Sequence, residues 1–200
     1  MQLLMSPASP FARTARVALR EAGLLDTVTE VAVTTTAMAT EPAVAAANPA
    51  GKIPVLLRAD GPAIHDSRVI CRYFDHLGAA RLYPEPRLWE TLTLEATGTA
   101  LSDAAVAMVY EARFKGTEGK SADWIEAQWQ KAVRILAAVD GRWMSHLAGP
   151  ADAGQIAVAC ALGYLDFRHE DRDWRSLAPA LAGWFEGFAA RPPMVDTDPG

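Results

Sequence analysis

The stretch IPVLLRADGPAIHDSRVICRYFDHLG, residues 53–78, contains two short apolar runs and then a helical pattern. The two runs, at 53–57 and 62–65, are joined through Asp60-Gly61, and an Asp-Gly pair between apolar runs is typical of a β-hairpin. From residue 66 an N-cap candidate precedes apolar residues at helical spacing, and a glycine ends the segment. The stretch therefore predicts two antiparallel strands followed by a helix over 66–78.

The residues before this stretch alternate between strand and helix patterns. Two strands are predicted at 2–5 and 28–33, and two helices at 10–22 and 40–49. The first helix follows a Ser/Pro turn. Pro10 suits its first turn, because the N–H that proline lacks would have no helical partner there. The order β-α-β-α-β-β-α predicts that residues up to 78 form a thioredoxin-like domain.

The residues after 78 show helical periodicity and no strand pattern. A segment with two prolines, 79–87, predicts a linker, and residues 88–200 predict an all-α domain. Helices are expected at about 87–114, 122–148, from 152 onward, and 176–190. Glycines are expected to end the first of these helices, and Pro192-Pro193 the last.

The composition excludes several classes of protein. The formal net charge of −5, without a dense Lys/Arg cluster, argues against a nucleic-acid partner. The four histidines are isolated from one another and from cysteine, so no metal site is expected. No apolar run reaches the roughly 18 residues of a membrane span, and MQLLMSP lacks the basic region of a secretory signal. Cys71 and Cys160 form no CxxC motif and suit a reducing compartment, so a cytoplasmic location is expected.

Three segments together resemble the glutathione S-transferase family over nearly the whole chain. SPASPFARTARVALRE (6–21) is similar to the family's first strand–turn–helix. NPAGKIPVLLRADGPAIHDSRVICRYFD (48–75) is similar to its glutathione-binding segment, N-P-x-G-K-[IV]-P-x-L followed by an acid-Ser pair. ADAGQIAVACALGYLDFR (151–168) and PALAGWFEGFAARP (179–192) are similar to its C-terminal helices. The resemblance implies an α/β thioredoxin-like N-terminal domain at 1–78 followed by an all-α C-terminal domain.

The third segment departs from the family in one respect. Where the family shows Ser/Thr-x-x-Asp at the start of the helix, this chain has Asp152 and Gln155. Aspartate caps a helix as well as serine does, and glutamine at this spacing can reach back to the cap, so the cap is expected to survive.

The resemblance implies that the protein activates the thiol of glutathione through Ser9. The thiolate is the nucleophile, and lowering a thiol pKa of about 8.5 by about two units requires roughly 2.7 kcal/mol. A hydroxyl donor and a helix dipole together supply that much. Ser9 matches the cysteine of the Cys-Pro-Phe sequence in thiol-transferase-like members. A serine here argues against deglutathionylation through a mixed protein disulfide. Ser6 is the alternative donor, and a serine that only caps the helix is the other alternative.

The remaining glutathione contacts are implied in the same way. The bond before Pro54 is expected to be cis, with the Ile53 N–H and C=O pairing with the cysteinyl part like an added strand. Lys52 is a candidate for the glycyl carboxylate. Ser67 suits the γ-glutamyl carboxylate at a helix N-terminus, and Asp66 suits its ammonium group.

The second substrate is expected to bind between the domains. Its pocket is assigned to Phe11, which also borders glutathione, and to Met108, Tyr110 and Phe114. Asp103 could reach the glutathione amine across the interface of an expected homodimer. The leading interpretation is a transferase that adds glutathione to a small hydrophobic electrophile. The alternatives are a glutathione-dependent isomerase or dehalogenase, and a non-catalytic binding module.

Overall fold

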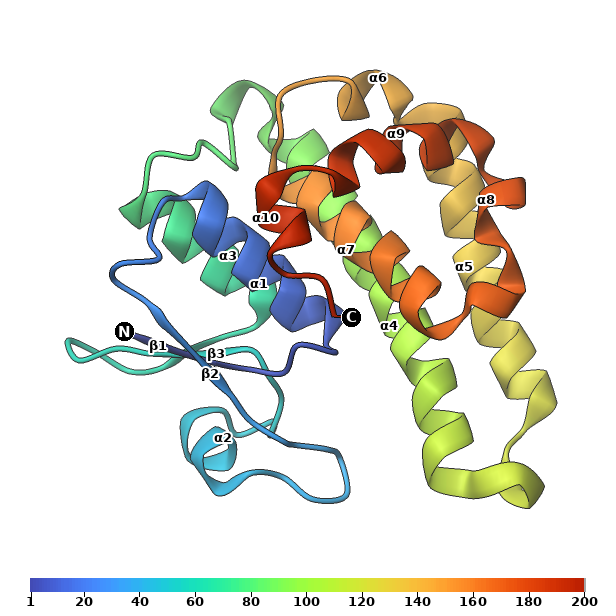
Figure 1. The fold of residues 1–200 in the computed structure, drawn as a ribbon, viewed down its shortest axis with the longest axis horizontal. Coiled ribbons are helices and arrows are strands. Elements are labelled where there is room, and N and C mark those ends of the chain that lie inside the picture. The colour runs from blue at the N-terminus through green and yellow to red at the C-terminus, as the bar shows by residue number, and fades with distance from the viewer. Residues whose placement is uncertain (200) are drawn as a thin grey trace.

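The computed structural model describes residues 1–199, with the side chains of residues 1–116 and 119–199. A four-stranded sheet and three helices form the N-terminal part (Figure 1): β1 (Gln2–Met5), α1 (Pro10–Glu21), β2 (Thr29–Ala32), α2 (Pro42–Ala47), β3 (Val55–Leu57), β4 (Ile64–His65) and α3 (Ser67–Leu77). The strand order is β2-β1-β3-β4; β1 pairs in parallel with β2 and antiparallel with β3, which pairs antiparallel with β4. The thioredoxin-like prediction is confirmed.

Alternation along β1 divides the apolar side chains between the two faces of the sheet. Leu3 and Met5 belong to the large core that includes α1 and α3, whereas Leu4 packs with Val44 of α2 and with Val55. Successive residues of a strand point to opposite faces, so one short apolar strand serves both cores. In Figure 1, α1 and α3 cover one face of the sheet and α2 lies on the other.

The C-terminal part is helical, as expected. Its helices are α4 (Leu88–Gly119), α5 (Ala122–Arg142), α6 (Met144–Leu147), α7 (Ala153–Arg168), α8 (Trp174–Leu177), α9 (Pro179–Ala189) and α10 (Pro192–Val195). α4 and α7 approach closely because both carry glycine at the crossing. A Cβ on Gly98 would stand 2.6 Å from the Ala157 carbonyl carbon, and one on Gly154 2.9 Å from the Thr91 carbonyl oxygen.

Several predicted helix boundaries are wrong. The helix expected at 87–114 continues to Gly119, although the backbone leaves helical geometry at Gly116, where φ is +63°. The helix expected at 122–148 ends at Arg142 and is followed by the short α6. The helix expected at 176–190 is divided into α8 and α9, and α9 ends at Ala189, ahead of Pro192-Pro193 as expected. Pro192 then begins the short α10, because proline at a first helical turn loses no hydrogen bond.

The segment 79–87 is tied to both parts of the molecule. The Leu82 N–H donates to Asp75 at 2.5 Å, and the Leu82 C=O accepts from the Ala153 N–H at 3.0 Å. Leu82 and Tyr83 are buried. The connection therefore packs as part of the core.

The end of the chain lies against α1. Arg13, buried on α1, donates to the Met194 carbonyl at 3.0 Å, and Arg16 donates to the Thr197 carbonyl at 3.3 Å. Arg191 pairs with Glu21 at 2.6 Å. Among the described helices, none is both long and apolar enough to cross a membrane.

Candidate functional site

The sheet register brings three separate loops to one edge. Leu4 of β1 faces Val55 of β3, and Val55 faces His65 of β4. The turn that follows β1, the residues that precede β3 and the residues that follow β4 therefore lie side by side. These are the three places where the sequence predicts the glutathione-site residues.

Ser9 is the N-cap of α1. Its Oγ accepts from the Ala12 N–H at 3.2 Å, and its own N–H donates to the Ser6 carbonyl at 3.0 Å, which closes the turn. The half-buried side chain thus uses an oxygen lone pair for the cap, and within residues 1–199 no acceptor is found for its hydroxyl proton. A hydroxyl can accept and donate at once, so capping leaves the donor available.

The Ile53–Pro54 peptide bond is cis, as the resemblance implies. β3 begins only at Val55, so the Ile53 N–H and C=O lie outside the ladder that β3 forms with β1 and β4. Lys52 is exposed, and its carbonyl accepts from the Asn48 side chain at 2.8 Å. This edge presents backbone groups that an extended peptide can pair with.

Asp66 and Ser67 form the start of α3. Asp66 has φ +68°, caps α3 by accepting from the Arg68 N–H at 3.0 Å, and forms a two-point ion pair with the Arg68 guanidinium at 3.0 and 3.1 Å. The hydrogen bonds from Arg68 lower the pKa of the Asp66 carboxyl. Ser67 is buried at the first helical position. Left-handed backbone at a non-glycine residue is uncommon and concentrates at functional sites.

Asp103 of α4 lies within electrostatic reach of this edge in the same chain. Partial burial raises the pKa of the Asp103 carboxyl, while the nearby charges of Lys52 and Arg68 act in the opposite direction. A role across a homodimer interface stays a prediction. Arg68 was missed by the sequence reasoning, because side chains two residues apart at a helix do not normally face each other.

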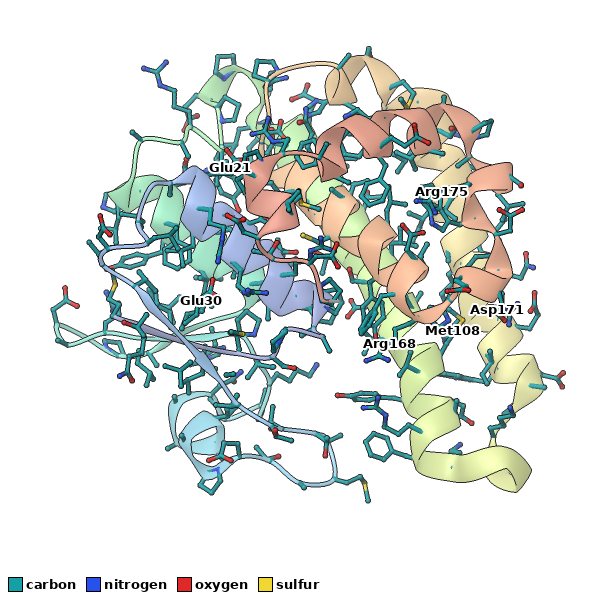
Figure 2. The ribbon with its side chains drawn as sticks, viewed as in Figure 1. Glu21, Glu30, Met108, Arg168, Asp171 and Arg175 are labelled. Carbon is teal, nitrogen blue, oxygen red and sulfur yellow. The ribbon has the colours of Figure 1, made fainter. Side chains whose placement is uncertain are left out.

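The residues assigned to the second-substrate pocket are not equally accessible. Phe11 is half-buried, Tyr110 and Phe114 are exposed, and the rings of these last two meet edge to face with centroids 5.1 Å apart. Met108 is only 2% exposed and lies in the core. Figure 2 shows Met108 between α4 and α5, whereas Arg168 lies on the side of α7 that faces the N-terminal domain.

The Ser9 turn packs against α7, and the gap between them is too narrow to admit a water molecule. This gap is lined by Pro7, Ala8, Ser9 and, from distant parts of the chain, Tyr164 and Pro199. Sequence reasoning missed Tyr164, because helical spacing marks it only as a core residue.

Cys71 and Cys160 are both buried and reduced. Burial raises the pKa of the Cys71 thiol, and raises that of Cys160 to about 11, so neither is a ready nucleophile. In the part of the chain that the structure describes, no group of three or more His, Cys, Asp or Glu side chains could hold a metal ion.

A second hollow lies between α3 and α4 and adjoins this edge, because Asp66 also lines it. This open groove of about 820 Å³ is lined by apolar residues such as Val69 and Leu92 and by the buried carboxyl of Glu95. Arg68 also lines it, so α3 contributes to both the groove and the candidate site.

Two family descriptions match the chain. "Glutathione S-transferase, N-terminal domain" matches residues 8–77, and "Glutathione S-transferase, C-terminal domain" matches residues 122–187. The GST-like protein YibF of Escherichia coli (strain K12), itself described as uncharacterized, is 29% identical over 100% of this chain and 98% of its own length.

Solved structures agree with the family matches. A glutathione transferase family member from Pseudomonas fluorescens Pf-5, crystallised with bound glutathione, is 38% identical and superposes with a TM-score of 0.96 over 100% of this chain and 98% of its own. The same protein with bound S-(propanoic acid)-glutathione is 37% identical and superposes with a TM-score of 0.91 over 100% of each chain. A glutathione S-transferase from Methylobacillus flagellatus KT with bound glutathione is 33% identical and superposes with a TM-score of 0.84 over 100% of this chain and 99% of its own.

Proposed function

The chain belongs to the glutathione S-transferase family, and from that premise we propose that it is an active glutathione transferase whose Ser9 hydroxyl holds the ionised thiol of glutathione. The observation that carries the proposal is the state of Ser9. Its oxygen caps α1 while its proton has no acceptor among the described residues, at the edge where the Ile53 backbone and Asp66 also lie.

Two interactions near Ser9 would lower the pKa of the glutathione thiol. A hydrogen bond from Ser9 to a thiolate is charge-assisted and contributes roughly 1.5–3 kcal/mol, and the N-terminus of a helix adds up to about 2 kcal/mol. Together they cover the roughly 2.7 kcal/mol that a two-unit fall in thiol pKa requires. The serine stays protonated throughout, since it only donates. The thiolate then attacks the electrophilic carbon of the second substrate.

Recognition of the tripeptide uses the loops around Ser9. The Ile53 N–H and C=O would pair with the cysteinyl residue, with Pro54 in its cis form beside them. Ser67 and the N-terminus of α3 would bind the γ-glutamyl carboxylate, and Asp66 its ammonium group. Lys52 would approach the glycyl carboxylate, and Phe11 would cover the border with the second substrate. That relatives 38% and 33% identical bind glutathione supports this assignment.

The test is a titration of the thiolate absorbance of bound glutathione. In the unaltered protein the thiol pKa should lie about two units below its solution value. Ser9→Ala should return it toward that value, and transferase activity at pH 6.5 should fall at least tenfold. Ser9→Thr keeps both hydroxyl and cap and should retain the depressed pKa. Ser9→Gly has no hydroxyl, so its bound glutathione should show the same raised thiol pKa as in Ser9→Ala. Because glycine keeps most of the cap free energy, Ser9→Gly should be more stable to unfolding than Ser9→Ala.

Other outcomes select the alternatives. If Ser6→Ala raises the thiol pKa and Ser9→Ala does not, the donor is Ser6. If the pKa is depressed but glutathione is recovered unconsumed, the enzyme is an isomerase or dehalogenase that recycles it. Absence of glutathione binding at millimolar concentration would make the chain a non-catalytic module.

The groove between α3 and α4 supports a proposed homodimer. Val69 on α3, which lines the groove, is 53% exposed although apolar, and Trp89, which does not line it but follows the lining residue Leu88, is 76% exposed. Apolar side chains concentrated along a groove are typical of protein interfaces. We place the twofold contact of a second copy there. The two reduced, buried cysteines fit our proposal of a cytoplasmic location.

A further inference from the structure

Arg13 lies one turn into α1 from Ser9, and it is buried although it is charged. Its N–H donates to the Ser9 carbonyl at 2.9 Å, so the residue belongs to the turn that Ser9 caps. Long side chains on a helix lean toward the helix N-terminus, which directs this guanidinium back toward Ser9. Accordingly, Arg13 and Ser9 line the same narrow gap between the Ser9 turn and α7.

The Arg13 guanidinium is packed between α7 and the last residues of the chain. A Cβ on Gly163 of α7 would stand only 2.5 Å from the Arg13 Nη1, so glycine leaves the room that the guanidinium occupies. The Nη2 donates to the Met194 carbonyl at 3.0 Å. In Figure 1 the residues after α10 run beside the start of α1, and Pro199 also lines the gap. Packing from both sides therefore fixes the position of this charge.

The charge of Arg13 is less well compensated than that of Arg16, three residues further along α1. Arg16 also donates to a carbonyl of the chain end, that of Thr197, but its Nε lies 2.9 Å from a carboxylate oxygen of Glu30. Arg13 pairs at 3.7 Å with Asp198, whose exposed side chain is screened by solvent. The buried Nε of Arg13 has no hydrogen-bond partner among the described residues. A buried cation without a close counterion is costly, and an anion bound nearby reduces that cost.

Cys160 and Tyr164, which also line the gap, do not supply that anion. Burial raises the pKa of the Tyr164 phenol, and raises that of the Cys160 thiol to about 11 although the charge of Arg13 acts in the opposite direction. Both are therefore neutral at physiological pH. Because the gap admits no water, the field of Arg13 reaches the Ser9 turn through packed protein, where charges interact more strongly than in solvent.

Resting on the transferase function proposed above, we propose that the buried positive charge of Arg13 stabilises the glutathione thiolate held at Ser9, in addition to the serine hydroxyl and the dipole of α1. Because Arg13 is buried, it acts through the packed turn and not by contact with the sulfur. The chain end takes part, since the Met194 carbonyl holds the guanidinium in place. A role limited to anchoring the chain end would not depend on charge, and this difference makes the proposal testable.

The test measures the thiol pKa of bound glutathione, by its thiolate absorbance, in variants of Arg13. Arg13→Gln removes the charge and should raise the thiol pKa by about half a unit to one unit. Arg13→Lys loses the paired N–H donors of the guanidinium but keeps the charge, so most of the depressed pKa should remain. Anchoring of the chain end alone predicts equal changes in the two variants, and equal changes would overturn the proposal.

Two controls separate charge from structure. Arg16→Gln loses the bond to the Thr197 carbonyl, the other anchor of the chain end on α1, and should leave the thiol pKa unchanged because Arg16 is already paired with Glu30. S-methylglutathione has no thiol to ionise, so the unaltered protein and both Arg13 variants should bind it equally by calorimetry. Weaker binding of S-methylglutathione to Arg13→Gln would show a distorted site and contradict a purely electrostatic effect.

The outcomes also distinguish this inference from the proposed function. If Ser9→Ala raises the thiol pKa and Arg13→Gln leaves it depressed, the role of Arg13 is wrong and the transferase assignment stands. If the thiol pKa of bound glutathione is not depressed in the unaltered protein, both fall. Should Arg13→Gln not fold, Asp198→Asn decides, because it removes the exposed partner charge. At low ionic strength, where screening is weak, it should lower the thiol pKa, and an unchanged or higher pKa would overturn the proposal.

Discussion

Ser9 and Asp66 are N-cap residues whose side chains also face the candidate site. In each, one oxygen accepts a backbone N–H of the helix that follows, at 3.2 Å for Ser9 and 3.0 Å for Asp66. The Ser9 proton has no acceptor among the described residues, and the second oxygen of Asp66 accepts from the Arg68 guanidinium at 3.1 Å. The N-termini of α1 and α3 therefore hold both capping side chains at this edge, and each adds the positive end of a helix dipole there.

Substitutions at Asp66 separate its role as the cap of α3 from its proposed contact with glutathione. Asp66→Ala loses the cap and keeps φ +68°, so the free energy of unfolding should fall by about 1–2 kcal/mol. Asp66→Gly also lacks the carboxylate, but glycine caps nearly as well and adopts positive φ freely, so its loss should be only a few tenths of a kcal/mol. Urea denaturation measures both.

Glutathione affinity should fall about tenfold in both Asp66 variants, because both lack the proposed partner of the ammonium group. Affinity that follows stability, lower in the alanine variant and normal in the glycine variant, would show that Asp66 acts only through the backbone.

At the level of elements, the start of α7 shows how a departure from the family pattern is accommodated. Asp152 is fully buried and caps α7, accepting from the Gln155 N–H at 3.1 Å, so the expectation that the cap survives is confirmed. Gln155 does not reach back to the cap. Its amide instead donates to carbonyls of α6 and of the loop that follows α6, including that of His146 at 3.1 Å. Asp152 also accepts from Thr91 at 3.0 Å and contacts His146 at 2.7 Å, which joins α4, α6 and α7.

Asp152→Ala should be among the most damaging single substitutions. It would leave the Thr91 hydroxyl, the Gln155 N–H and the His146 ring without their shared acceptor in a buried place, at a cost of about 3 kcal/mol or more. Asp152→Asn keeps one carbonyl oxygen for the cap and should lose about half as much. Thermal unfolding measures the stability of both variants. Equal losses of stability would contradict the interpretation that Thr91, Gln155 and His146 share the Asp152 carboxylate.

The α3–α4 groove contains a titratable group that makes stability depend on pH. Burial raises the pKa of Glu95 from 4.5 to about 7, and the nearby charge of Asp66 adds to the rise. The Tyr83 hydroxyl, which donates to Glu95 at 2.6 Å, and the charges of Arg68 and Arg72 act in the opposite direction. The folded protein therefore holds a proton between pH 4.5 and 7 that the unfolded chain releases. Stability should fall as pH rises through this window, by up to about 3 kcal/mol, and stay level above it.

Glu95→Gln tests this directly, because an amide mimics the protonated carboxyl at every pH. The variant should be more stable than the unaltered protein at pH 8 and nearly equal to it at pH 4.5, as measured by urea denaturation at the two pH values. Since all other titrating groups are common to both proteins, their contributions cancel. A difference independent of pH would contradict the raised pKa.

At the scale of the whole molecule, the two domains are held together by α1, the end of the chain and the packed segment at 79–87. The same packing leaves the apolar groove between α3 and α4 uncovered. Val69→Lys, which puts a charge in that groove, should convert the proposed dimer to monomers in sedimentation at micromolar concentration. Leu177→Lys, at a residue 45% exposed on α8, is the matched control and should leave the assembly unchanged. A monomeric unaltered protein would exclude the homodimer.

The order and type of the elements were predictable up to Leu77 because their signals are short. Asp60-Gly61, the capping Asp66 and Gly78 each act within a few residues, and the predicted hairpin and helix are present. Boundaries after residue 114 were not predictable to the same degree. Whether a proline such as Pro192 ends one helix or begins another depends on what packs around it, and here Arg13 holds the Met194 carbonyl.

By itself, the sequence determined the strand and helix order, the serine at the first helix, and the acid-serine pair, because turns, caps and periodicity are local interactions. The tertiary structure alone decided which distant groups meet. The register of β1, β3 and β4 brings Ser9, Ile53 and Asp66 to one edge. The packing of the chain end against α1 brings the Met194 carbonyl to the buried Arg13. Contacts between residues far apart in the chain depend on how whole elements pack, and no short segment contains that information.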